Sequence, residues 1–144
     1  MQHELGTWQS RWEFLGPDGK VAQVWEGTET FQPGPSDRVV IVETEVPEVG
    51  NKSISIRFYH PIERKIYFAS VGQNGDFWLL TEPVGSSVLT SEPHMNADGS
   101  VSTIRFTTLE KDDDSMKVLM EQSRDGGKTW RPVFRQYLTR SKQN

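Results

Sequence analysis

The sequence contains no cysteine in its 144 residues. That absence excludes disulfide bonds, thiolate zinc sites, iron–sulfur ligation by cysteine and a cysteine nucleophile. Long apolar runs are also missing, because no stretch approaches the ~20 consecutive apolar residues that a membrane-spanning helix needs. We therefore expect no membrane span.

An excess of basic charge is likewise absent. The net charge is −4 and the isoelectric point is about 5.4, whereas nonspecific nucleic-acid binding needs a basic face. The N-terminal residues Met1 to Glu4 lack the basic region and apolar run of a secretion signal. We expect no nucleic-acid partner and a cytoplasmic location, although a signal already cleaved would leave no trace in this sequence.

Alanine and leucine are scarce, with 3 and 8 residues, whereas 45 residues are Val, Ile, Thr, Phe, Trp or Tyr. That balance favours β-strand over helix. A chain of 144 residues can bury one core, so residues 1–144 are predicted to form a single domain.

Turn-forming residues interrupt the chain at short, even intervals and leave ten segments of strand length. Regular strands separated by such turns are typical of β-sandwiches and β-barrels. An open sheet of ten strands would expose long edges to pairing with other chains. We therefore predict an all-β fold, a closed antiparallel up-and-down barrel of about ten strands with little or no helix. A barrel of this size can hold an interior cavity.

Apolar and polar residues alternate within the predicted strands, which gives each strand one apolar face. In the first strand this face carries Trp8 and Trp12. In residues 53–60 we assign the inward face to Ile54, Ile56 and Phe58, with His60 following in register. The aromatic residues on the predicted inward faces are Trp8, Trp12, Phe14, Trp25, Phe58, Phe68 and Phe77.

Two stretches, Val39 to Val42 and Phe77 to Leu80, are apolar on both faces. A strand that is apolar on both sides favours packing against something outside the sheet. A second subunit is one such partner, so a homodimer is among the expected assemblies.

The first strand begins Gly6-Thr7-Trp8, and the last carries Arg135-Gln136-Tyr137 followed by Arg140. Here the chain resembles the calycins, the lipocalins and fatty-acid-binding proteins. The resemblance implies that Trp8 packs across the closed end of the barrel, beneath Arg140 or Arg135. It also implies that Arg135 and Tyr137 point inward and hold a carboxylate, for which the planar guanidinium fork is well suited.

Fatty-acid-binding proteins carry a helical lid after their first strand, but here only Leu15 to Lys20 separates the first two predicted strands. The chain is more similar overall to lidless, lipocalin-like bacterial domains of uncharacterised function. Haem-binding barrels of the nitrobindin type also start near Gly-Thr-Trp, and they hold haem through a late histidine. The last histidine here is His94, so we expect no haem and no other cofactor.

Residues 123–130 match the Asp-box pattern, Ser-x-Asp-x-Gly-x-Thr-Trp. Propellers repeat this motif in each blade, and one copy cannot build a propeller of at least about four blades. We predict a structural role, in which Asp125 bonds backbone amides across the turn and Trp130 covers the hairpin. The acidic run Asp112 to Asp114 lacks the glycine and terminal glutamate of a calcium loop, and no metal site is predicted.

These features favour a barrel that binds a small hydrophobic or amphiphilic ligand, with an anionic end as one form. Two alternatives remain: a dimerising structural barrel with a filled core, and an isomerase- or hydratase-type enzyme that uses the same cavity. The enzyme would need His60, Glu43 or Glu45 near Arg135 or Tyr137. No catalytic residues are assigned. The candidate ligand-binding residues are Arg135, Tyr137, Trp12, Trp25, Phe58 and His60.

Overall fold

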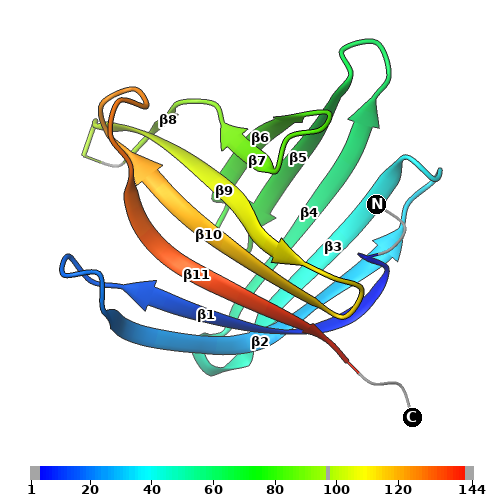
Figure 1. The fold of residues 1–144 in the computed structure, drawn as a ribbon, viewed down its shortest axis with the longest axis horizontal. Coiled ribbons are helices and arrows are strands. Elements are labelled where there is room, and N and C mark those ends of the chain that lie inside the picture. The colour runs from blue at the N-terminus through cyan, green and yellow to red at the C-terminus, as the bar shows by residue number, and fades with distance from the viewer. Residues whose placement is uncertain (1–3, 97, 142–144) are drawn as a thin grey trace.

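Ten antiparallel strands close into a barrel in the computed structural model (Figure 1), which describes residues 4–96 and 98–141. The first and last three residues of the predicted domain, and residue 97, lie outside this description. The strands are β1 (Gly6–Leu15), β2 (Val21–Pro33), β3 (Val39–Val46), β4 (Asn51–His60), β5 (Lys65–Gly72), β6 (Phe77–Pro83), β7 (Val88–Ser91), β9 (Val101–Lys111), β10 (Ser115–Ser123) and β11 (Arg131–Arg140). The predicted all-β barrel is confirmed.

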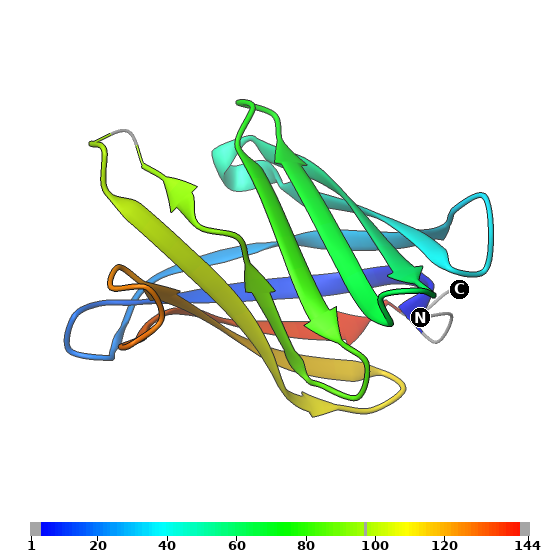
Figure 2. The same cartoon turned by 90° about the horizontal axis from the view of Figure 1, so that it is seen from above.

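Strand pairing follows the chain from β1 to β7, then passes to β9, β10 and β11, and β11 pairs with β1 to close the barrel (Figure 2). The two-residue strand β8 (His94–Met95) pairs with the start of β9, and a 3₁₀ turn, η2 (Pro47–Val49), joins β3 to β4. The described residues contain no helix that is long and apolar enough to span a membrane.

Because every neighbouring pair is antiparallel, β2, β4, β6, β9 and β11 all run in the same direction. Their C-terminal ends therefore meet at one end of the barrel, beside the start of β1. This arrangement brings together residues that lie far apart in the sequence.

The N-terminal segment closes that end of the barrel. The indole Nε1 of Trp8 donates a 2.8 Å hydrogen bond to the carbonyl of Glu4. The guanidinium of Arg140 lies 4.4 Å from the Trp8 ring centroid and donates a 2.6 Å bond to the Leu5 carbonyl. Arg140 thus takes the covering position expected for Arg140 or Arg135, and Trp8 is buried in a cluster with Phe31, Val40, Val42, Met116 and Leu138.

The predicted inward face is correct for β1 but wrong for β4. Ser53, Ser55 and Arg57 line the interior, so the alternate residues of β4 point outward. Ile54 and Ile56 are accordingly 48 % and 43 % exposed. The reason is that the apolar face of β4 continues the outer faces of β3 and β5, where Ile41, Ile56 and Ala69 are direct partners. Phe77, also predicted to face inward, is 51 % exposed.

The Asp-box turn has the predicted structural role. The Asp125 carboxylate accepts hydrogen bonds from the backbone amides of Lys128 and Thr129 at 3.0 and 2.9 Å, and from the Thr129 hydroxyl at 2.6 Å. These bonds, with one from Ser123, lower the pKa of Asp125 to about 2. Trp130 closes the hairpin through a 3.1 Å bond to the Gly127 carbonyl.

Candidate ligand-binding site in the barrel interior

The barrel interior contains a half-open cavity of about 400 Å³. Its apolar wall includes Phe31, Phe68, Leu89, Phe106, Val118 and Leu138, which come from six different strands. The volume falls within the range of about 300–1,000 Å³ typical of small-molecule sites. The interior is therefore hollow rather than filled by side chains.

Two groups of hydrogen-bonded polar side chains lie inside the barrel. The side-chain amide of Gln136 donates a 2.9 Å hydrogen bond to the Ser10 hydroxyl and another to the Glu29 carboxylate. On the opposite wall, the hydroxyl groups of Ser55 and Ser70 are hydrogen-bonded at 3.1 Å. Each of these side chains thus has at least one hydrogen-bond partner within the protein.

Four charged side chains meet at the end of the cavity that the N-terminal segment closes. Arg57, Glu82 and Lys111 lie near the C-terminal ends of β4, β6 and β9, which run in the same direction, and Glu4 precedes β1. The Lys111 Nζ lies 2.6 Å from Glu4 Oε1, and Arg57 Nη1 donates to Glu4 Oε2. Glu4 therefore bridges the two cations, with one carboxylate oxygen on each.

The surroundings push the pKa values of these carboxyls in opposite directions. Burial alone would raise the pKa of Glu4, but the charges of Arg57 and Lys111 and their hydrogen bonds outweigh it, so this pKa is lowered. Burial raises the pKa of Glu82, although the charge of Arg57 partly offsets it. The pKa of Glu29 is also raised, mainly by burial.

Arg57 also contacts the apolar wall. Its guanidinium carbon lies 5.8 Å from the ring centroid of Phe31 and 6.0 Å from that of Phe68. The side chain keeps 22 % of its surface exposed. A cation between two phenyl rings beside a cavity can contact the polar and apolar parts of one ligand.

Of the predicted aromatic lining residues, Trp12 lines the cavity and is 7 % exposed. Trp25 pairs directly with Trp12 across β1 and β2, and so shares its inward face. Trp25 lies beyond the cavity, where its ring packs against Phe14 with centroids 4.7 Å apart.

Arg135 and Tyr137 do not face the cavity, which corrects the predicted carboxylate anchor. Their neighbours Phe134, Gln136 and Leu138 line the interior, and alternate residues of a strand point to opposite faces. On the outer face the Lys117 Nζ lies 5.7 Å from the Tyr137 ring centroid.

Phe58 and His60 also lie on the outer face, because they alternate along β4 with residues that line the interior. Phe58 stacks on Tyr67, with ring centroids 5.2 Å apart and planes 8° from parallel. The Nδ1 atom of His60 accepts a 3.2 Å bond from the backbone amide of Glu63. The six predicted site residues are thus divided: the two tryptophans are inside the barrel and the other four are outside.

The sequence pattern does not predict five charged residues of the cavity, Glu4, Glu29, Arg57, Glu82 and Lys111. Arg57 lies on the polar face of β4, opposite the apolar face that the pattern predicts to be interior. The alternation in β4 does contain a usable signal, because Ser53, Ser55 and Arg57 form one face. That face is predicted to be interior if the cavity is assumed to be polar. The described residues hold no group of three or more His, Asp or Glu side chains that could bind a metal ion.

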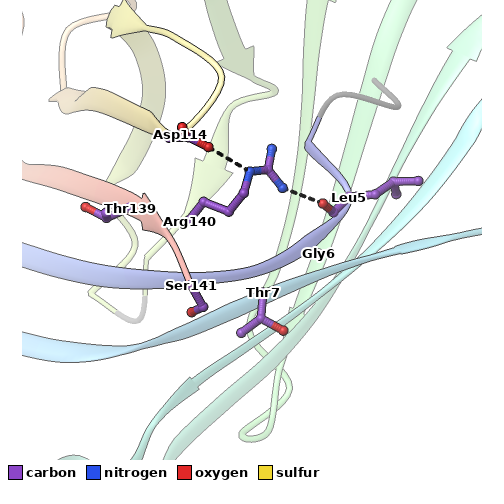
Figure 3. Close-up of a pocket in the computed structure, with 7 residues that line it drawn as sticks. All are labelled: Leu5, Gly6, Thr7, Asp114, Thr139, Arg140 and Ser141. Carbon is purple, nitrogen blue, oxygen red and sulfur yellow. Dashed lines mark hydrogen bonds and ion pairs between the residues drawn. The ribbon is translucent and has the colours of Figure 1, made fainter. Parts of the chain in front are cut away.

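A second depression lies between the ends of β1 and β11 (Figure 3). Arg140 spans it, bonded to the Leu5 carbonyl and lying 3.5 Å from the Asp114 carboxylate. Arg140 also covers Trp8, so we assign this depression to the structure that closes the barrel end.

No protein-family model and no curated protein sequence matches this chain. Among solved structures, the crystal structure of Rv2717c from M. tuberculosis is similar, with a TM-score of 0.53 over 97 % of this chain and 94 % of that one. The two sequences are 15 % identical, so the similarity concerns the fold alone.

Proposed function

We propose that the barrel binds a small amphiphilic molecule in its interior. The observation that carries this proposal is the cavity of about 400 Å³, which has an apolar wall and a cluster of charged groups at one end. A ligand with an apolar body and a polar head would match both parts. The resemblance of the first strand to the calycins supports the same function.

The cavity volume favours a short or medium-sized ligand over a long lipid. About 400 Å³ lies near the lower limit of ordinary ligand sites. The absence of a helical segment between β1 and β2, where fatty-acid-binding proteins have a lid, agrees with a smaller ligand.

Tryptophan fluorescence tests the proposal, because Trp12 lines the cavity. Titration with medium-chain amphiphiles, fatty acids, retinoids and haem should change the emission for at least one medium-chain compound. Trp12→Phe should remove most of that change. The matched control, Trp130→Phe in the outer turn, should retain it. A flat signal throughout the panel, with no shift in melting temperature, would contradict the proposal.

The enzyme alternative has less support. Its hypothesis named His60, Glu43 and Glu45 as groups near Arg135 or Tyr137. Glu43 and Glu45 are exposed, and the other three side chains lie on the outer face. We therefore do not propose a reaction.

The homodimer has a specific observation in its favour. On the outer face of β3–β6, strand register places Ile41, Ile56, Ala69 and Leu79 in one row and Ile54, Val71 and Phe77 in the next. Exposed apolar patches of this kind mark protein–protein contacts. We propose that a second copy covers this face, which we call the β3–β6 face.

Charge favours a second copy over another partner. Glu43 lies at one end of the β3–β6 face, beside a 3.9 Å ion pair between Glu45 and Lys52, and Lys65 lies at the other end. A two-fold axis across the strands would place the acidic end of each copy against the basic end of its partner.

Light scattering should give twice the 16.5 kDa mass of one chain. Phe77→Asp combined with Ile56→Asp should give the monomer. Leu109, another outer apolar residue that is 46 % exposed, lies on β9 away from this face. Leu109→Asp is therefore the control that should leave the dimer intact. A monomeric wild-type protein would overturn the dimer proposal without affecting ligand binding.

A further inference from the structure

The charged end of the cavity holds two cations but only one carboxylate that is hydrogen-bonded to them. Glu4 accepts one bond from Lys111 and one from Arg57, so these three groups together carry a net positive charge. Glu82 lies nearby and forms no hydrogen bond with either cation, but its charge interacts with both. The cluster therefore has a net positive charge only while Glu82 is protonated, and burial favours that form.

Arg57 has donors to spare. Within the described part of the chain its guanidinium donates one hydrogen bond, from Nη1 to Glu4, and its Nε and Nη2 atoms donate none. The guanidinium faces the cavity between the rings of Phe31 and Phe68. A carboxylate that entered along the apolar wall could form two parallel hydrogen bonds with Nη1 and Nη2, and it would then replace Glu4 at Nη1.

We propose that the acidic head group of a small amphiphilic carboxylic acid binds to Arg57 in exchange for the Glu4 carboxylate. Glu4 is then a competitor built into the chain, occupying the head-group site when no ligand is bound. This inference rests on the proposed function, because it names the ligand class of the same cavity and the group that regulates access to it.

The exchange requires only rotation of the Glu4 side chain. The Glu4 carbonyl is fixed by Trp8, and the Leu5 carbonyl by Arg140, so the backbone of this segment stays in place. Lys111 is 46 % exposed and lies at the rim of the cluster. It can keep Glu4 as its partner after Arg57 has turned to the ligand, so neither charge is left buried without a partner.

Calorimetric titration with octanoate and with octanol separates the head group from the chain, because the two probes have the same apolar body. At about pH 8 the wild-type protein should bind octanoate more tightly than octanol. Arg57→Met should weaken octanoate binding about tenfold or more and leave octanol within about twofold. Glu4→Gln should strengthen octanoate binding about tenfold, again with little effect on octanol.

Glu82→Gln is the matched control. It removes a carboxylate from the same cluster without releasing a bond to Arg57. If it strengthens octanoate binding as much as Glu4→Gln does, the effect is general electrostatics and the competition is refuted. If Glu4→Gln does not fold, Glu4→Asp keeps the charge on a shorter arm and should give a smaller gain, and no gain would overturn the inference. If octanoate and octanol bind equally in every variant, the exchange at Arg57 is refuted but ligand binding in the cavity is not. If neither probe binds to any variant, the proposed function is refuted as well.

Discussion

Two buried glutamates in the same cavity respond to their surroundings in opposite ways. Glu4 touches two cations, and their charge lowers its pKa against the effect of burial. Burial raises the pKa of Glu29, and it outweighs the hydrogen bond from the neutral amide of Gln136 and the charge of Arg57. Two directly bonded cations thus reverse the effect of burial at Glu4, whereas a neutral partner does not reverse it at Glu29.

Glu29→Gln should therefore stabilise the protein at neutral pH. The raised pKa means that the folded state binds a proton more readily than the unfolded state, so ionisation of Glu29 costs stability. That cost is absent below the ordinary value of 4.5 and is fully present above the folded pKa. Thermal unfolding of both proteins should show a difference that grows as the pH rises from about 4.5 towards 8.

The control for this experiment is Glu48→Gln in the exposed 3₁₀ turn, which should follow the wild type at every pH. A Glu29→Gln protein that is less stable than the wild type at pH 8 would show that the charged form is favoured inside the barrel.

At the scale of the element, β2 pairs with its two neighbouring strands over different lengths. It pairs with β1 along nearly its whole length but with β3 only from Thr28 onward. The position before that point is Gly27, where an added Cβ would lie 2.0 Å from the carbonyl oxygen of Glu45. The close approach of β3 to β2 thus requires glycine at this residue.

Gly27→Ala should destabilise the protein by about 1–3 kcal/mol, because the new methyl group meets backbone that cannot move aside. Chemical denaturation measures the loss. Gly16→Ala is the comparison, since its nearest neighbour is the flexible Asp18 side chain at 3.2 Å. An equal cost at the two positions would contradict the steric explanation.

At the scale of the whole molecule, the barrel closes unevenly. Two residue pairs join β6 to β7 and three join β7 to β9, whereas every other neighbouring pair in the barrel has at least six. Local opening has the lowest free energy where few hydrogen bonds and contacts must be broken. The β6–β7–β9 seam is therefore the weakest part of the wall.

Native-state hydrogen exchange should show this directly. Amides of β7 should exchange at least about tenfold faster than those in the middle of β1, which pairs on both sides. Saturation with a ligand that fills the cavity should slow exchange in β7 most, because Leu89 of this strand lines the cavity. Equal protection of β7 and β1 would contradict the weak seam.

The sequence alone was sufficient to predict the barrel, because evenly spaced turn residues and a two-residue period of apolar residues are local features. It also predicted the Asp125 turn, whose hydrogen bonds fall within residues 123–129. The inward phase of β1 was correct as well, because its apolar face carries two tryptophans and a phenylalanine.

Only the tertiary structure decided which face of β4 and of β11 is inside. A two-residue period is symmetric between the two faces, and a polar cavity with an apolar outer patch reverses the usual assignment. The head-group site depends on closure in the same way. Glu4 lies 53 residues from Arg57 and 107 from Lys111 in the sequence, and they meet because alternate strands of a closed barrel end on the same side.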